Sequence, residues 1–135
     1  MLHSLRVADY MAQQLITLSP DTTIDQAIKT LLTHRVSGAP VVQDGELVGV
    51  FSESDCLEDI LQSGYYEMSS GLVGDVMTPR PQTIHVDDSI LSAAEIFHRD
   101  HRRRLPVVDD QGCLVGQISR RDVLRALDSL THPQT

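Results

Sequence analysis

Apolar residues recur every three or four positions in two stretches of the chain, near residues 24–31 and near residues 90–97. This spacing places them on one face of an α-helix, so each stretch predicts an amphipathic helix. Thr22 and Asp88 precede the two stretches in positions suited to helix capping. The apolar positions are Ile24, Ala27, Ile28 and Leu31 in the first stretch and Ile90, Ala93, Ala94 and Phe97 in the second.

Short apolar runs surround these helices and have the length of β-strands. One run precedes each helix, "LITL" at 15–18 and "QTIH" at 82–85. Two more runs follow each helix, "APVV" and "LVGVF" around an Asp-Gly turn, and "LPVV" and "LVGQI" around a Gln-Gly turn, which predicts a hairpin. A second helix is predicted from Ser52 to about Leu61, and again from Ser119 to about Leu127. The order β-α-β-β-α thus occurs twice, and we expect an α/β fold.

The two halves also match in their motifs. "V-x-D-x-M" begins at Val7 and Val73, and "G-x-x-S-x-x-D" begins at Gly49 and Gly116. The one extra residue of the second copy lies in its hairpin turn, where duplicated structure tolerates insertion best. We therefore divide the chain into a first repeat, 7–61, a linker, 62–72, a second repeat, 73–127, and a tail, 128–135, which we expect to be frayed.

One repeat of this size would leave a sheet face uncovered and would be marginally stable alone. Two repeats packed face to face cover each other, so we predict a single module with pseudo-twofold symmetry. Any cleft between the repeats then occurs twice.

Composition sets the class of protein. The chain has 135 residues, with 41% hydrophobic and 22% charged residues, which is typical of an ordered globular protein. No apolar run reaches the roughly 20 residues that span a bilayer, and the first residues lack a signal-peptide pattern. We expect a cytoplasmic protein without membrane association. Cys56 and Cys113 show no metal-like spacing and are expected to be reduced thiols.

The net charge of −8 is unevenly distributed. Residues 1–68 contain ten acidic and three basic residues, whereas residues 69–135 contain nine acidic residues and eight arginines. An acidic chain repels a phosphate backbone, so nucleic-acid binding is disfavoured. The basic run "HRRRL", residues 101–105, is either a solvated surface or a place for one small anion.

The duplicated motifs, in this order, resemble a tandem of cystathionine-β-synthase (CBS) domains, the Bateman module. The resemblance covers nearly the whole chain. It implies an adenosine-containing ligand, with AMP, ADP or ATP favoured and S-adenosylmethionine also accommodated, bound in the clefts between the repeats. It also implies homodimers, and an unidentified effector protein that reads ligand occupancy.

Ser and Asp at this spacing have two compatible interpretations. At a helix start they form a capping arrangement. A carboxylate there can also accept hydrogen bonds from both hydroxyls of a ribose, while the free N–H groups of the helix attract the adjoining phosphate.

The resemblance assigns residues from both repeats to each cleft. The first cleft is predicted to be complete in composition, with a base pocket, a ribose carboxylate and arginines for phosphate. In the second cleft, Arg102 replaces an apolar residue and Glu53 places negative charge near the phosphate position, so we expect weak, different or no binding. The first set is Thr17, Leu18, Val36, Ser37, Gly38, Arg103, Arg104, Ile118, Ser119, Arg120, Arg121 and Asp122; the second is Thr83, Ile84, Arg102, Arg103, Phe51, Ser52 and Asp55.

No nucleophile–base set, Walker A sequence or metal-ligand cluster is present in the sequence, so we expect neither an enzyme nor a catalytic cofactor. His98 and His101 lie three residues apart but lack a further metal ligand. The exposed part of apolar helix faces such as Leu124 and Leu127 is a candidate dimer surface. A ligand-free interaction module is the main alternative function, and nucleic-acid binding through the arginine run is the third.

Overall fold

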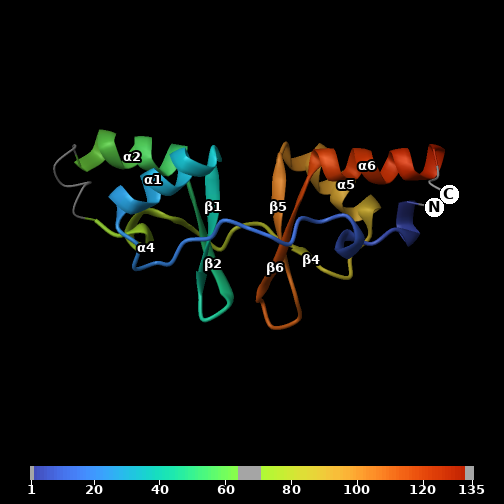
Figure 1. Ribbon diagram of the computed structural model, residues 1–135, viewed down its shortest axis with the longest axis horizontal. Helices are drawn as coiled ribbons and strands as arrows, with labels where there is room; N and C mark the ends of the chain where they lie inside the picture. The colour runs from blue at the N-terminus through green and yellow to red at the C-terminus, as the bar shows by residue number, and fades with distance from the viewer. Residues whose placement is uncertain (1, 64–70, 133–135) are drawn as a thin grey trace. The chain divides into compact units, whose positions relative to one another are not determined.

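The computed structural model describes residues 2–63 and 71–132 and divides into two compact units. The central unit consists of Ile16–Pro81, from the middle of the chain. The terminal unit combines Met1–Leu15 with Gln82–Thr135, from its two ends. Each unit contains a three-stranded sheet and helices (Figure 1), which confirms the predicted α/β class.

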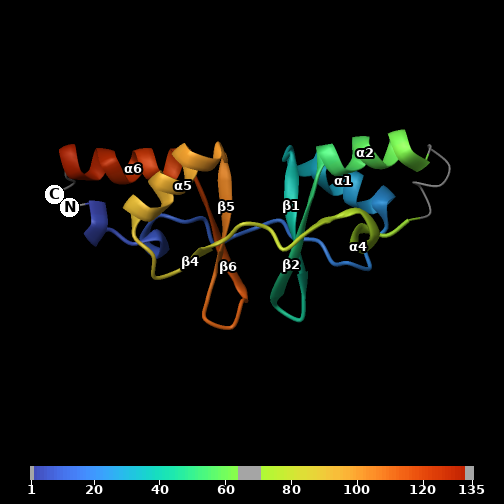
Figure 2. The ribbon, with the colours of Figure 1, turned by 180° about the vertical axis from the view of Figure 1, so that it is seen from behind.

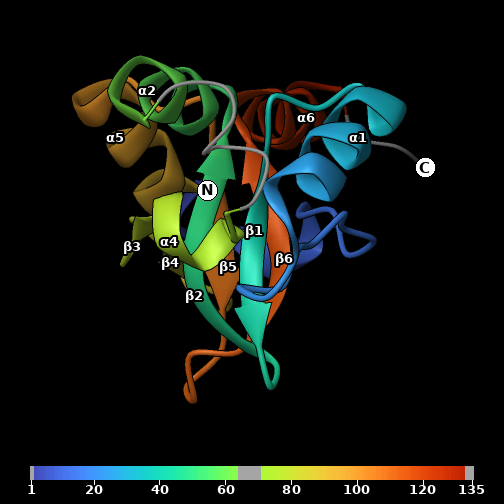
Figure 3. The ribbon, with the colours of Figure 1, turned by 90° about the vertical axis from the view of Figure 1, so that its left-hand side faces the viewer.

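The central unit is built on an antiparallel sheet in the order β1-β2-β3. Helices α1 and α2 lie at the end of the β1–β2 hairpin opposite its turn, and α4 lies against the hairpin (Figure 3). Its elements are α1 (Ile24–His34), β1 (Gly38–Gln43), β2 (Glu46–Ser52), α2 (Glu53–Ser63), α4 (Val73–Val76) and β3 (Thr78–Pro79).

The terminal unit repeats this plan with one difference in its sheet. The strand order is β4-β5-β6, in which β4 runs parallel to β5 and β5 antiparallel to β6. Helices α5 and α6 pack together at the end of the β5–β6 hairpin opposite its turn (Figure 2). Its elements are η1 (Leu2–Ser4), η2 (Val7–Asp9), β4 (Ile84–His85), α5 (Ile90–Asp100), β5 (Arg104–Val108), β6 (Leu114–Ser119) and α6 (Arg120–Thr131).

The predicted apolar faces form the two cores. In the central unit, α1 buries Ile24, Ala27 and Leu31 against the sheet. In the terminal unit, α5 buries Ile90, Ala93 and Phe97. Phe51 and Phe97 are the only aromatic residues among the buried hydrophobic side chains of the described residues, so aliphatic packing supplies most of the apolar burial.

The segment before each repeat's first helix packs onto the other repeat's hairpin. Met77, near the start of the second repeat, contacts the position of Gly49 on β2, while Met11 does the same at Gly116 on β6. A β-carbon built on Gly116 would lie 2.5 Å from the sulfur of Met11 and 2.9 Å from the Ala12 carbonyl oxygen. We call residues 5–12 and 71–78 the crossing segments, because each packs across the hairpin of the other repeat. The glycine of each "G-x-x-S-x-x-D" motif is therefore required for the close approach of a crossing segment.

Backbone hydrogen bonds fix the two crossing segments in the same way. The Ile90 N–H, at the start of α5, donates to the Leu5 carbonyl at 2.8 Å, and Ala12 and Gln117 exchange hydrogen bonds of 2.8 and 2.9 Å. In the central unit the Ile24 N–H donates to the Gly71 carbonyl at 3.1 Å. The compact units and the sequence repeats are thus different partitions of the chain.

Several boundaries differ from expectation. The caps of α1 and α5 are Thr23 and Ser89, one residue later than predicted, because their hydroxyls accept hydrogen bonds from the N–H groups of Gln26 and Ser92. The predicted strand at 15–18 reduces to one parallel backbone pairing between Leu18 and Val41. Helix α6 continues to Thr131, beyond the predicted start of the tail. Of the predicted linker, residues 64–70 lie outside the described residues.

Candidate functional site

Ser119 and Asp122 form a reciprocal cap at the first turn of α6. The Asp122 Oδ2 atom accepts hydrogen bonds from the Ser119 N–H at 2.9 Å and from the Ser119 hydroxyl at 3.0 Å. The Asp122 N–H in turn donates to the Ser119 Oγ atom at 3.2 Å. Ser52 and Asp55 make the same contacts at 2.8, 3.0 and 3.3 Å. The capping interpretation of both motifs is confirmed.

The second oxygen of each carboxylate has a different partner. Asp55 Oδ1 accepts a hydrogen bond from the Thr78 hydroxyl at 3.0 Å. Asp122 Oδ1 accepts from the Arg125 guanidinium at 2.9 Å, and the Arg125 side chain is 60% exposed. Thr78 aligns with Ala12 in the duplicated sequence, so no hydroxyl is available at the matching position of the terminal unit. The second oxygen of Asp122 is therefore held by an exposed, charged donor, and that of Asp55 by a neutral donor on a strand.

The arginine run lies beside the Asp122 cap. Arg104 on β5 faces Ser119 in the register of β5 and β6. The Arg120 N–H donates to the Arg103 carbonyl at 3.1 Å, and its Nε atom donates to the Arg102 carbonyl at 2.6 Å. The side chains of Arg103, Arg104, Arg120 and Arg121 are exposed. Positive charge thus gathers at a helix start whose N–H groups already favour an anion.

The structure groups each repeat's predicted residues with that repeat's own cap. In the central unit, Leu18 bonds to the backbone of Pro40 and Val42, Gly38 pairs with Ser52, and the Glu53 N–H donates to the Ser37 carbonyl. We call the predicted site residues within one unit a half-site. The half-site of the central unit consists of Thr17, Leu18, Val36, Ser37, Gly38, Phe51, Ser52 and Asp55. The half-site of the terminal unit consists of Thr83, Ile84, Arg102, Arg103, Arg104, Ile118, Ser119, Arg120, Arg121 and Asp122. The pairing of half-sites across the two repeats stays a prediction.

Four of the predicted site residues have buried hydrophobic side chains. Leu18, Phe51, Ile84 and Ile118 belong to the hydrophobic cores and are 0–6% exposed. Any contact they make with a ligand must come from the main chain. Thr17 and Ser37 are exposed and Val36 is half-buried, so their side chains are accessible.

Arg102 is engaged within its own unit. Its Nε atom donates to the Gln82 side chain at 3.0 Å, and Gln82 donates to Asp100 at 2.7 Å. Hydrogen bonds from Arg99, and then from Gln82, lower the pKa of Asp100. In the aligned repeats, Arg102 occupies the position of Val36. The hydrogen-bonded side chains of Arg102, Gln82 and Asp100 therefore replace an apolar side chain at this position.

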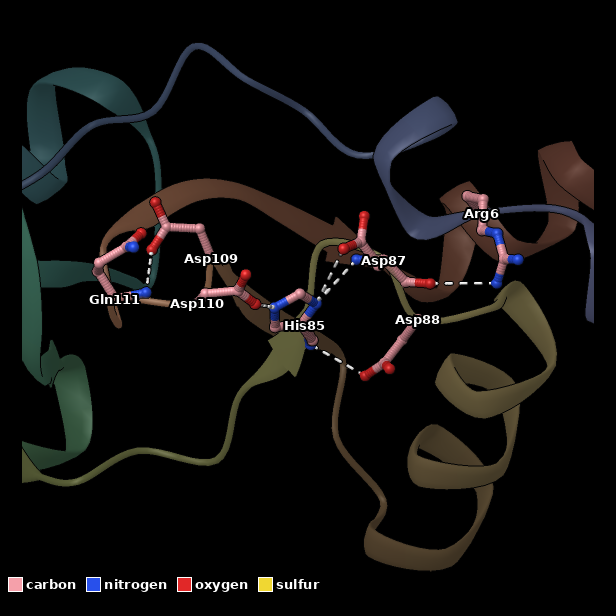
Figure 4. Close-up of polar contacts among 7 residues, drawn as sticks. All are labelled: Arg6, His85, Asp87, Asp88, Asp109, Asp110 and Gln111. Atoms are coloured by element: carbon pink, nitrogen blue, oxygen red, sulfur yellow. Dashed lines mark hydrogen bonds and ion pairs between the residues drawn. The ribbon is translucent and has the colours of Figure 1, made fainter.

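A polar network around His85 was not expected from the sequence. Figure 4 shows His85 between the hairpin turn and the segment that follows β4. Its Nδ1 atom accepts from the Asp87 N–H at 3.0 Å, so Nε2 carries the proton donated to Asp110 at 2.6 Å. Arg6 donates to the Asp87 carbonyl at 3.2 Å, which links the chain start to this network. His85 and Asp110 lie 25 residues apart, and no short-range signal pairs them.

Metal-ligating side chains and the Cys56 thiol are further candidates for chemistry among the described residues. Within residues 2–63 and 71–132, no group of three or more metal-ligating side chains comes together. Cys56 follows Asp55 directly, and burial raises the pKa of its thiol, with a further rise from the charges of Asp55, Asp59 and Glu53. The thiol is therefore protonated at neutral pH and is a poor nucleophile. Across the described helices, none combines the length and the apolar character needed to cross a bilayer.

Comparison with known proteins gives consistent matches. The family model described as "CBS domain" matches residues 7–62 and 73–129. The chain is 35% identical to "CBS domain-containing protein CBSX1, chloroplastic" of Arabidopsis thaliana, over 89% of this chain and 63% of that protein. It is 36% identical to an inosine-5'-monophosphate dehydrogenase of Thermoplasma acidophilum, over 80% of this chain but only 21% of the enzyme. The chain thus spans less than two thirds of the length of both relatives.

Solved structures match over nearly the whole chain. The crystal structure of CBSX2 in complex with AMP has a TM-score of 0.82 and 34% identity, covering 96% of this chain and 100% of that one. The CBS domain pair of MJ0100, in complex with 5'-methylthioadenosine and S-adenosylmethionine, has a TM-score of 0.74 and 25% identity, covering 93% and 97%.

Proposed function

Because this chain belongs to the CBS domain family, we propose that it is a regulatory module that binds an adenosine nucleotide such as AMP, ADP or ATP. The ligand lies between the two repeats, with its ribose on Asp122 and its phosphate at the start of α6. The base lies against Thr17, Val36 and Ser37 of the first repeat. The similarity to CBSX2, which was crystallised with AMP, supports this ligand class.

The arrangement at the α6 start is the observation that carries the proposal. It combines an oriented carboxylate, the positive end of the α6 helix dipole and four exposed arginines. The cap uses one oxygen of Asp122, and exposed Arg125 pairs with the other. Asp122 Oδ2 already accepts two hydrogen bonds within the cap, whereas Oδ1 accepts one from Arg125 and retains capacity to accept from a ribose hydroxyl.

The second cleft binds weakly or not at all in this proposal. Asp55 is only 9% exposed and its second oxygen already bonds to Thr78. Glu53 occupies the first position of α2, where a phosphate would otherwise meet the helix N-terminus. Arg102 is tied to Gln82 at the place of the apolar wall.

Matched variants of the two carboxylates test the proposal. Calorimetric titration of the unmodified protein with AMP, ATP and S-adenosylmethionine identifies the ligand. Asp122→Asn removes the charged acceptor, and each charged hydrogen bond is worth about 1.5–3 kcal/mol, so we expect the dissociation constant to rise at least about tenfold. Asp55→Asn, the control, should change it little. Equal loss in both variants, or none in Asp122→Asn, would contradict the assignment.

Ligand binding across two repeats would regulate by favouring one relative orientation of the repeats. We place the output in self-association through the helices or in an effector protein, and we propose no catalytic role. This agrees with the match to only about a fifth of the dehydrogenase, 21% of its length. S-adenosylmethionine is the second ligand to test, because the MJ0100 domain pair was crystallised with it.

A ligand-free interaction module remains the alternative function. It is favoured by the fact that both Asp122 oxygens already have partners within the protein. Absence of heat or thermal stabilisation with all three ligands, together with a stable self-associated state, would select it.

A further inference from the structure

The motif carboxylate of each unit is connected to the crossing segment of that unit, directly in one case and through an arginine in the other. In the central unit the Thr78 hydroxyl, on the second crossing segment, donates to Asp55 Oδ1 at 3.0 Å. In the terminal unit the Nη1 atom of Arg125 donates to Asp122 Oδ1 at 2.9 Å and to the Tyr10 carbonyl at 3.5 Å. Tyr10 belongs to the first crossing segment, so this segment reaches the carboxylate through one side chain of α6.

Tyr10 restricts the position of the Arg125 side chain. The Arg125 guanidinium lies over the Tyr10 ring, 6.0 Å from its centroid, which is within the range of a cation–π contact. Tyr10 is itself fixed, because its hydroxyl hydrogen-bonds to the Ser129 hydroxyl at 2.8 Å and it packs against the core of the terminal unit. The Arg125 side chain is 60% exposed, and a long exposed side chain without such contacts samples many rotamers. Tyr10 therefore favours the rotamers in which Arg125 reaches Asp122.

The contact with Arg125 completes the orientation of the Asp122 carboxylate. The cap fixes only Oδ2, which accepts from the N–H and the hydroxyl of Ser119. The terminal torsion of an aspartate is broad, so a carboxylate held by one oxygen can still turn. Arg125 holds the other oxygen, and the remaining acceptor capacity of Oδ1 then points in one direction. A group that is already oriented binds its partner at a lower entropic cost.

The duplicated positions of the central unit cannot supply the same support. Arg125 aligns with Glu58, and Tyr10 aligns with Val76. An ionised Glu side chain only accepts hydrogen bonds, and a Val side chain has no polar group. The support through Tyr10 is therefore particular to the carboxylate that we assign to the ribose, and Glu58 is its matched control position.

We propose that Tyr10 and Arg125 are positioning residues of the adenosine site, in which Tyr10 orients Arg125 and Arg125 orients Asp122 toward the ribose. This inference rests on the proposed function and deepens it. It assigns a part of the site to the first crossing segment, which begins the other repeat. A change at Tyr10 then alters ligand affinity without any contact between Tyr10 and the ligand.

Calorimetric titration of full-length variants with AMP tests the positioning role. Arg125→Met keeps the length of the side chain and removes its donors, so the dissociation constant should rise about two- to fivefold, the range for an exposed ion pair. Tyr10→Leu removes the ring without changing any charge and should raise the constant about twofold. The double variant should lose no more affinity than Arg125→Met alone, because Tyr10 acts through Arg125. Glu58→Met should leave the constant unchanged.

Tyr10→Phe separates positioning from a general effect on stability. It loses the hydrogen bond to Ser129 but keeps the ring and the carbonyl that contact Arg125. Its melting temperature should fall while its affinity for AMP stays the same. Thermal unfolding of every variant establishes that it is folded at the temperature of the titration.

Three other results would overturn the inference, each in a different way. Loss of affinity in Arg125→Met but not in Tyr10→Leu would mean that Arg125 only attracts the phosphate by its charge. Tighter binding by Arg125→Met would mean that Arg125 competes with the ribose for Asp122. Absence of binding of AMP, ADP and ATP to the unmodified protein would contradict the proposed function itself, and the positioning role with it.

Discussion

Gly49 and Gly116 show how a residue that looks like part of a ligand motif serves the fold. The sequence predicted their recurrence but not their role, because the residues that crowd them, Met77 and Met11, come from the other repeat. By contrast, the roles of Ser119 and Asp122 as a cap were predictable, since their partners lie within one helical turn.

Gly116→Ala should destabilise the protein by about 1–3 kcal/mol, because its methyl group would overlap the Met11 sulfur and the Ala12 carbonyl. Gly49→Ala should cause a similar loss of stability, because Met77 and Thr78 crowd it in the same way in the central unit. Urea unfolding followed by circular dichroism measures the loss. Adding Met11→Ala removes one of the two overlaps, so the double variant should lose less than the sum of the single losses. An unchanged or higher stability for Gly116→Ala would contradict the crossing geometry, since alanine otherwise suits a strand better than glycine.

Cys56 should titrate above an ordinary thiol. Burial and the neighbouring carboxylates disfavour its thiolate, so its pKa is raised. In a Cys113→Ser variant, the rate of iodoacetamide modification measured against pH should have its midpoint above that of the urea-unfolded chain. The pH midpoint is compared, and not the rate itself, because burial slows the reaction even without a change in the pKa. A midpoint at or below the unfolded value would mean that the surroundings of Cys56 favour the charged form.

At the scale of elements, local patterns predicted the helices and hairpins well and their ends less well. The apolar spacing of α1 and α5 is a property of each helix, and the structure buries those residues. The caps shifted by one residue because Thr22 and Thr23, or Asp88 and Ser89, are equally good capping residues in sequence. Helix α6 extends to Thr131, and Tyr10, from the other end of the chain, bonds to Ser129 in its last turns at 2.8 Å, a contact that no local pattern reveals.

Ser119→Ala should lower stability by about 1 kcal/mol, since it leaves the first-turn N–H of Asp122 without its partner and removes a donor to the carboxylate. Thermal unfolding measures the loss, and Ser119→Thr, which keeps a hydroxyl, should retain most of the stability. The equivalent Ser52→Ala should lose a similar amount, because the same reciprocal contacts are present there. A much smaller loss for Ser119→Ala would indicate that Arg125 and the backbone N–H of residue 119 hold Asp122 in place without the hydroxyl.

At the scale of the whole molecule, the duplication was visible in the sequence. The packing of each crossing segment on the hairpin of the other repeat was not. Repeat boundaries follow similarity, and similarity says nothing about which copy a segment packs against. The units are instead decided by contacts such as those of Leu5 with Ile90 and Ala12 with Gln117, which join the two ends of the chain. The candidate site divides in the same way: each half-site follows from its own repeat's motif, whereas their assembly depends on long-range packing.

Deletion of residues 1–12 should therefore weaken the terminal unit and spare the central one, although residues 7–12 belong to the first repeat. The amides of Ile90 and Gln117 lose their acceptors, the carbonyls of Leu5 and Ala12. Hydrogen exchange followed by NMR should show faster exchange at these two amides. The amides of Val42 and Val73 donate to Leu18 and Thr22 within the central unit and should remain protected. Protection lost first at Val42 and Val73 would mean that the chain start stabilises its own repeat. That result would contradict the packing of the first crossing segment on the hairpin of the second repeat.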